Sequence, residues 1–224
     1  MCGRITFRAS GKDLATLFDL IEVPDLDLEP RYNIAPSQPI LAVREPANGV
    51  GRELVTLRWG LVPHWAKDLK IGYKLINARA ETVATTPSFR SAFRKRRCLV
   101  PASGYYEWQK LEKAKQPFYF HRKDDRPFAF AGLWEHWESP DGELVESCTI
   151  LTTEANDLAR PVHNRMPVIV DAADFGLWLN PAGNLEQCQA LLRPYAGEGM
   201  EAYPVSSFVN SPHHQGPQCV QRVA

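Results

Sequence analysis

The second residue of the chain, Cys2, has the makings of a double nucleophile. It follows Met1 in the run Met-Cys-Gly-Arg, and removal of Met1 would leave an α-amine and a thiol on adjacent carbons. Such an amine condenses with an aldehyde to an imine, and the thiol then closes onto the imine carbon as a thiazolidine ring. An α-amine titrates at about 7.7–8.0 and a thiol at about 8.5, so both are partly available at neutral pH. The alternative is that Cys2 is simply a small residue that begins a strand.

A second polar group lies in residues 76–82. In an extended chain Asn77, Arg79 and Glu81 share one face. There Asn77 could orient a carbonyl or hydroxyl group, and Arg79 could hold a phosphate through two parallel N–H donors. A capped surface loop with a solvated charge pair is the alternative.

Two groups suited to proton transfer lie further along the chain. Glu107 stands among aromatic residues, and desolvation by such neighbours favours a protonated carboxyl that can shuttle protons at neutral pH. A glutamate pointing to solvent from an edge strand is the alternative. His163 and Arg165 lie between two prolines, which favours a rigid loop around an imidazole that exchanges protons at about pH 6.5. A purely structural histidine fits the same position.

Composition limits the kind of protein that carries these groups. The 224 residues are 44% apolar, enough for one sizeable core. Lys and Arg number 26, as do Asp and Glu, which argues against a large duplex-DNA footprint but leaves local phosphate contacts open. The five cysteines are odd in number and widely spaced, as reduced thiols are. Motifs for metal ligation, Gly-rich phosphate loops and Gly-x-Ser-x-Gly are missing, so we expect no metal and no cofactor.

Local patterns indicate the elements that must position these residues. Residues 3–8 resemble a short strand, and Ser10 can cap a helix over residues 12–21. Pro39–Arg44 and Glu53–Trp59 form a strand pair around a turn at 47–49. Further helices are expected from Thr86, over 171–179 with Asp171 as cap, and over 185–192. The other strand candidates are 98–101, 105–109, 117–122, 128–134, 143–152, 167–170 and 203–206.

Strands and helices do not alternate along this pattern, which disfavours a parallel α/β sheet. We expect an α+β fold: one domain over residues 1–224, built on a curved or barrel-like, mainly antiparallel sheet with peripheral helices. A basic run, Arg90 and residues 94–97, could contact a nucleic-acid backbone. Charged helix ends of this kind are usually just solvated.

Six segments taken together resemble the SRAP family, the abasic-site processing proteins also described in animals as binders of 5-hydroxymethylcytosine in embryonic stem cells. They occur in family order and span nearly the whole chain, with the stretch after about residue 209 matching least clearly. The segments are Met-Cys-Gly-Arg at 1–4, Arg-Tyr-Asn-Ile-Ala-Pro at 31–36, Trp-Gly-Leu-Val-Pro-His-Trp at 59–65, Ile-Asn-Ala-Arg-Ala-Glu-Thr at 76–82, Arg-Cys-Leu-Val-Pro-Ala-Ser-Gly-Tyr-Tyr-Glu-Trp at 97–108 and His-Asn-Arg-Met-Pro at 163–167.

The resemblance implies that Cys2, freed of Met1, forms a thiazolidine with the ring-opened deoxyribose of an abasic site in single-stranded DNA. Glu107 would assist ring opening, His163 would act as a second acid or base, also in reversal, and Asn77 would hold Cys2 and the sugar. The arginines would grip flanking phosphates, while Trp and Pro would act as stacking or wedge surfaces. The implied DNA-binding residues are Arg4, Asn33, Pro36, Trp65, Arg79, Trp108 and Arg165.

Two other functions remain open at this point. One is a thiol autopeptidase that exposes Cys2, with Glu107 or His163 as base. Only Met1 precedes Cys2, however, and aminopeptidases remove a methionine before a small residue, so self-cleavage is not demanded. The other is a non-covalent reader of modified DNA bases that uses aromatic side chains. The expected partner is single-stranded DNA with abasic sites. The expected protein is a cytoplasmic monomer (at the nucleoid when bound to DNA) with no membrane segment.

Overall fold

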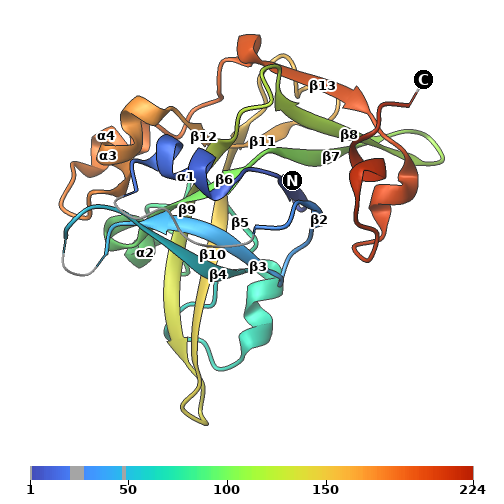
Figure 1. The fold of residues 1–224 in the computed structure, drawn as a ribbon. Coiled ribbons are helices and arrows are strands. Elements are labelled where there is room, and N and C mark those ends of the chain that lie inside the picture. Colours follow the sequence, from blue (N-terminus) through green and yellow to red (C-terminus); the bar gives the residue numbers. More distant parts are fainter. Residues whose placement is uncertain (1, 21–27, 47–48, 224) are drawn as a thin grey trace.

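Five strands of the protein close into a barrel. The computed structural model describes residues 2–20, 28–46 and 49–223, and Figure 1 shows its fold. β3 (Pro39–Arg44) pairs with β4 (Glu53–Trp59) on one side and with β6 (Arg97–Ala102) on the other. β6 pairs with β9 (Phe128–Glu138), which pairs with β10 (Leu144–Glu154). β10 returns to β4 in a parallel pairing, so the ring is closed and mixed.

Barrel closure explains why these strands are so apolar. All six residues of β6 are buried, as are the first six of β9, because one face fills the barrel and the other is covered by neighbouring elements. Short strands pair at the borders of this ring: β5 (Asn77–Arg79) and β11 (Arg165–Pro167) with β10, and β12 (Ile169–Val170) with β9.

A second, antiparallel sheet lies beside the barrel. Its strand order is β13-β8-β7-β1-β2. Its strands are β1 (Ile5–Phe7), β2 (Arg31–Ile34), β7 (Gly104–Lys110), β8 (Lys115–Arg122) and β13 (Met200–Pro204). Because β1 pairs with β7, the first residues of the chain run along β7. Figure 1 shows the amino terminus at this sheet, on the side where the C-terminal segment lies.

The helices are short and peripheral. They are α1 (Gly11–Phe18), α2 (Arg90–Lys95), α3 (Phe175–Leu179) and α4 (Leu185–Ala190). α1 packs on α3 through stacked rings of Phe18 and Phe175, 5.1 Å apart. No helix among the described residues has the length and apolar character needed to cross a membrane. The expected α+β architecture, a barrel-like and mainly antiparallel sheet with peripheral helices, is confirmed.

Several expected boundaries are wrong at helix ends. Ser10 does cap α1, but the helix ends at Phe18 because Asp19 adopts a left-handed conformation (φ 51°) that stops helical propagation. The last part of that expected helix, like residues 47–48 of the expected turn, lies outside the described residues. α2 begins at Arg90 rather than Thr86, since the intervening residues form turns. Asp171 makes no side-chain cap, and a short 3-10 turn precedes α3.

The basic run at the end of α2 is not a free cationic face. Arg97 is 2% exposed and donates to backbone carbonyls of Phe93 (2.6 Å), Trp178 (2.6 Å) and Asn180, which fastens α2 and α3 to β6. Burial lowers the pKa of its guanidinium. Arg96 donates to the buried carboxylate of Glu135 at 2.7 Å. Two of the five cations in this run, Arg96 and Arg97, therefore hold the fold together.

A close backbone contact fixes the loop that leads into β5. Gly60, at φ 125°, packs so tightly on Gly72 that a Cβ on Gly60 would lie 2.7 Å from the Gly72 carbonyl oxygen. Next to it, the buried indole of Trp59 donates to the Ile76 carbonyl at 2.9 Å. Together these contacts set the position of Asn77, the first residue of β5.

Gly60→Ala tests this contact. We expect the free energy of unfolding to fall by about 2 kcal/mol or more, because alanine adds both a disfavoured positive φ and a backbone clash. Gly199→Ala is the matched control, since its Cβ would meet nothing within 4 Å. Urea unfolding of both variants makes the comparison, and equal stability of the two would contradict the packing argument.

A candidate active site at the amino terminus

Strand β10 gathers one half of the site. β5 runs parallel to it, with Asn77 opposite Ile150 and Arg79 opposite Thr152. β11 runs antiparallel on it, with Arg165 opposite Glu154. Segments about ninety residues apart in sequence thereby meet at the carboxyl end of one strand, where three of the predicted site residues converge.

Cys2 is held at this junction by its backbone. The Asn77 side-chain amide donates to the Cys2 carbonyl oxygen at 2.7 Å. On the next residues the Tyr106 N–H donates to the Arg4 carbonyl at 3.0 Å, which extends the β1–β7 pairing toward the amino terminus. Cys2 itself is fully buried. The structure thus places Asn77 and Cys2, two of the residues predicted for the site, in direct contact.

Glu107 and His163 form a pair beside Cys2. Glu107 is only 5% exposed, so it does not point into solvent from an edge strand. Its Oε1 lies 4.0 Å from His163 Nε2. The Arg165 backbone N–H donates to His163 Nδ1 at 3.0 Å. Because an N–H can only donate, Nδ1 is the acceptor and the neutral ring carries its proton on Nε2, facing Glu107.

The surroundings keep the Cys2 thiol protonated. Burial raises the pKa of the thiol well above its ordinary range, and the negative charge of Glu107 raises it further. Burial likewise raises the pKa of Tyr105, with smaller contributions from Cys2 and Glu107. The thiol therefore needs a proton acceptor when it reacts, and Glu107 is the nearby carboxylate.

Arg4 belongs to a network that the sequence did not indicate. Its Nη1 donates to Asn33 Oδ1 at 2.6 Å and to the Val209 carbonyl at 2.9 Å. Its guanidinium lies 5.7 Å from the centre of the Trp108 ring. Asn33 is fully buried and donates to carbonyls of the C-terminal segment, so in this arrangement it lies behind Arg4 rather than at the surface.

The remaining predicted DNA-binding residues differ in how free they are. Arg165 makes a two-pronged ion pair with Glu81, at 2.6 and 3.0 Å. Arg79 is exposed and Pro36 is half-buried. Trp65 is 50% exposed, which is unusual for so large an apolar side chain. The side chains of Arg79 and Trp65 are therefore open to solvent, whereas the Arg165 guanidinium is already bound by the Glu81 carboxylate.

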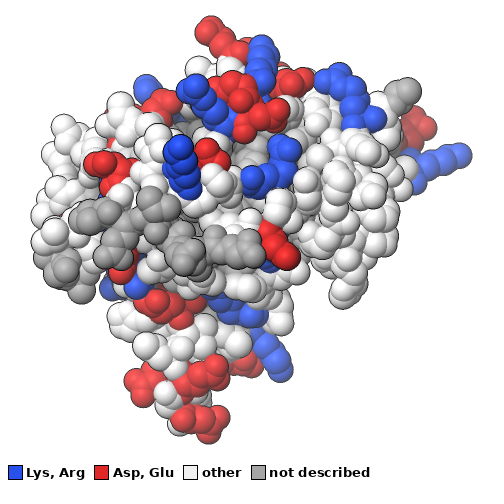
Figure 2. Space-filling view, viewed as in Figure 1, with Lys and Arg blue, Asp and Glu red and all other residues white. Residues whose placement is uncertain are grey.

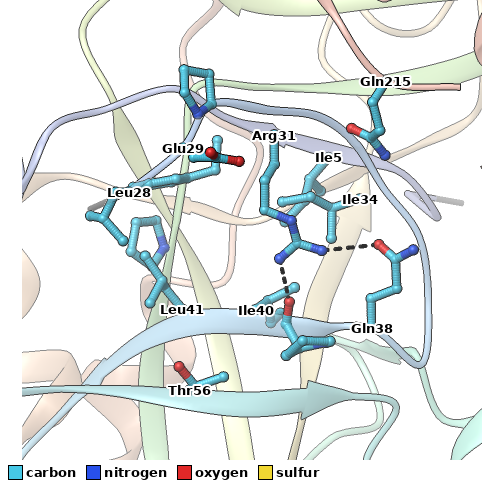
Figure 3. A pocket seen from close by; sticks show the side chains of 14 residues that line it. Ile5, Leu28, Glu29, Arg31, Ile34, Gln38, Ile40, Leu41, Thr56 and Gln215 are labelled. Atoms are coloured by element: carbon cyan, nitrogen blue, oxygen red, sulfur yellow. Dashed lines mark hydrogen bonds between the residues drawn. The ribbon is translucent and has the colours of Figure 1, made fainter. Parts of the chain in front are cut away.

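The structure also contains a cavity of about 670 Å³ (Figure 3). It is lined by β1, β2 and β3 side chains, and none of the site residues predicted from the sequence is among its described lining. Inside it, Arg31 donates to the Pro39 carbonyl at 2.6 Å and to Gln38 Oε1 at 3.1 Å. These bonds fasten the turn between β2 and β3. In the described part of the chain, no three or more His, Cys, Asp or Glu side chains are arranged to hold a metal ion.

The Glu81–Arg165 pair has a testable pH dependence. Hydrogen bonding to Arg165 lowers the pKa of Glu81. A depressed carboxyl pKa stabilises the fold above its unfolded value of about 4.3, and this contribution disappears as the pH falls through the folded value. Glu81→Gln should therefore cost about 1 kcal/mol or less at neutral pH, because the pair is half-exposed.

That difference should shrink as the pH falls below about 4.3 and vanish once Glu81 is protonated in the folded protein as well. Urea unfolding at neutral pH and over a series of acidic pH values measures it. Glu138→Gln, at an exposed position on β9, controls for the loss of a carboxylate that is not placed opposite Arg165. A difference that stays constant with pH would contradict the assignment.

Comparison with known proteins identifies the family. The family model of the SOS response associated peptidases (SRAP) matches residues 1–212. The chain is 45% identical over 224 residues to the abasic site processing protein YoqW of Bacillus subtilis, covering 99% of both chains. It is 33% identical to the abasic site processing protein HMCES of Gallus gallus, over 85% of this chain and 66% of that one. A crystal structure of a Bacteroides thetaiotaomicron protein superposes with a TM-score of 0.87 at 30% identity, covering 100% of both chains. The chain belongs to the SRAP family.

Proposed function

We propose that this protein processes abasic sites in single-stranded DNA by linking Cys2 covalently to the opened sugar. The observation that carries the proposal is the meeting of three groups at one point. Asn77 holds the Cys2 carbonyl at 2.7 Å, and the Glu107–His163 pair, at 4.0 Å, interacts electrostatically with the Cys2 thiol through Glu107. The names of relatives, abasic site processing proteins, support the same reading.

The first step is opening of the sugar ring. An abasic deoxyribose exists mainly as a closed hemiacetal, so its anomeric hydroxyl must lose a proton while the ring oxygen gains one. Glu107 and the Nε2–H of His163 are suited to this exchange, since an oxygen about 3 Å from each could hydrogen-bond both groups at once. The products are an aldehyde and a free hydroxyl.

The second step joins protein and DNA. The α-amine of Cys2, exposed by loss of Met1, attacks the aldehyde carbon, and water leaves to give an imine. The thiol then adds across the carbon–nitrogen double bond, sulfur to carbon and its proton to nitrogen, which closes the thiazolidine. Because the thiol is held protonated, Glu107 is placed to carry that proton.

The DNA strand would be held by charge and stacking. We assign Arg4, Arg79 and Arg165 to phosphates, and Trp65, Trp108 and Pro36 to stacking or wedging, with Asn33 supporting Arg4 from behind. We further propose that residues 1–224 act as one domain without a metal or cofactor. A peptidase with a Cys2 thiolate as nucleophile is less favoured, because burial and Glu107 both oppose the thiolate.

Incubation with single-stranded DNA that carries one abasic site tests the linkage. We expect an adduct that survives a denaturing gel, with an intact mass equal to protein without Met1 plus DNA minus one water. Cys2→Ala should lose this adduct but still yield one after borohydride reduction, because its α-amine still forms the imine. A variant with an uncleavable residue before Cys2 should form neither the stable adduct nor the adduct trapped by borohydride, because Cys2 then has no free α-amine. A stable adduct that Cys2→Ala forms without reduction would contradict the thiazolidine mechanism. If the parent protein forms no adduct, the autopeptidase or the non-covalent reader of modified bases becomes the favoured function.

Glu107→Gln tests the proton transfer separately from binding. General acid–base groups contribute about 100-fold or more to rate, so we expect cross-linking at saturating DNA to slow by about 100-fold. Affinity for the same strand without the lesion should stay within about twofold. Single-turnover rates and fluorescence anisotropy measure the two. Equal losses of rate and affinity would make Glu107 a structural residue.

A further inference from the structure

A second, smaller hollow opens beside the amino terminus. It has a volume of about 330 Å³, is open to solvent, and is lined by Gly3, Arg4, Trp108, Lys115 and Asn210. Two of these side chains are cations and none is an acid. An aromatic face, two cations and an amide are the groups that hold one nucleotide of a single strand, and the volume is within the range of small-ligand sites.

One wall of this hollow comes from the C-terminal segment. We call residues 206–215 the C-terminal clasp. Asn33 binds the clasp from below, its side-chain nitrogen donating to carbonyls of Ser211 (2.8 Å) and His214 (2.9 Å). Gln215 completes the attachment, donating to the Asn33 carbonyl at 3.0 Å. These contacts join positions about 180 residues apart in the chain.

The clasp orients the aromatic face of the hollow. Asn210 Oδ1 accepts a hydrogen bond from the Trp108 indole N–H at 2.8 Å. The Asn210 and Val209 carbonyls accept from Arg4 at 3.3 and 2.9 Å, which keeps the guanidinium 5.7 Å from the Trp108 ring centre. The hydrogen bond from the indole N–H therefore fixes the orientation of the Trp108 ring. Rotation of the ring would break this bond and the contact with the Arg4 guanidinium.

Lys115 supplies the second cation from the neighbouring strand. In the β7–β8 pairing Lys115 lies opposite Lys110, and Pro117 lies opposite Trp108. Directly opposed residues and those two apart share a face of the sheet, so Lys115 is a diagonal neighbour of Trp108. Its side chain is exposed, so its ammonium is available to a phosphate at the rim.

We propose that this hollow is a nucleotide subsite for the DNA strand, next to the lesion. The base stacks on Trp108, a backbone phosphate contacts Lys115, and the clasp holds Trp108 and Arg4 in position through Asn210. This inference rests on the proposed function, since it takes single-stranded DNA as the substrate. It adds Lys115 as a binding residue and Asn210 as a positioning residue.

The first experiment compares Lys115→Gln with Lys113→Gln. Lys113 lies in the same hairpin and is also exposed but does not line the hollow. Affinity for an undamaged single-stranded oligonucleotide is measured by anisotropy at several salt concentrations. We expect Lys115→Gln to weaken binding several-fold and to reduce the log–log salt slope by about 0.7, with Lys113→Gln near the parent protein. The subsite is overturned if Lys115→Gln binds DNA with the affinity and salt slope of the parent protein, or if both variants lose affinity equally.

The second experiment tests the positioning role by a double-mutant cycle. Asn210→Ala removes the acceptor, and Trp108→Phe removes the indole N–H. We expect Asn210→Ala to weaken DNA binding several-fold in the parent protein and far less in Trp108→Phe, because the shared hydrogen bond is already gone. Additive effects overturn the positioning role.

The cross-linking and binding measurements together distinguish a failure of the covalent function from a failure of the nucleotide subsite. A parent protein that never forms the adduct, yet whose DNA affinity depends on Lys115, refutes the covalent function and keeps the subsite. A parent protein that cross-links normally, with the Lys115 and Asn210 variants unchanged in binding, refutes the subsite and keeps the covalent function.

Discussion

The site depends on one strand that performs two tasks. The first part of β10 pairs with β9 from Leu144 to Ile150, and its parallel contact with β4 closes the barrel. Its last part is then free to pair with β5 and β11 instead. A closed barrel has a fixed register, because a slip at one pairing would have to be repeated around the ring. Asn77 and Arg165 are therefore held in fixed positions beside β10. Their hydrogen bonds to the Cys2 carbonyl and to the His163 ring fix those two residues in turn.

Burial is the second constraint on the chemistry. The amino-terminal thiol, the Glu107 carboxylate and the Tyr105 ring lie together out of water. Desolvation favours neutral forms, so the thiol stays protonated until a base receives its proton. The backbone around it is held by hydrogen bonds from Asn77 and Tyr106. A site built in this way supports a reaction in which protons move between fixed groups.

A net charge of zero conceals an uneven distribution. Figure 2 shows acidic residues gathered at the protruding end of the β9–β10 hairpin, where Glu138, Asp141 and Glu143 are exposed. Beside the amino-terminal residues, Arg4 and Lys115 line a hollow whose lining holds no acid. Attraction of a polyanion is therefore local, and the covalent bond rather than the overall field would give the complex its permanence.

The sequence by itself determined the local elements and the kinds of chemistry available. Short, mainly apolar runs on either side of a turn indicated the bounds of β3 and β4, and Ser10 indicated the start of α1, because these signals act over a few residues. Motif resemblance pointed to Cys2, Glu107 and His163, but it could not measure how close they lie. Barrel closure, the burial of Arg97 and the docking of the C-terminal clasp were decided by tertiary structure alone. The Asn77–Cys2 bond spans 75 positions and the Arg4–Val209 bond spans 205. Contacts at such separations depend on strand order and register, which no local pattern encodes.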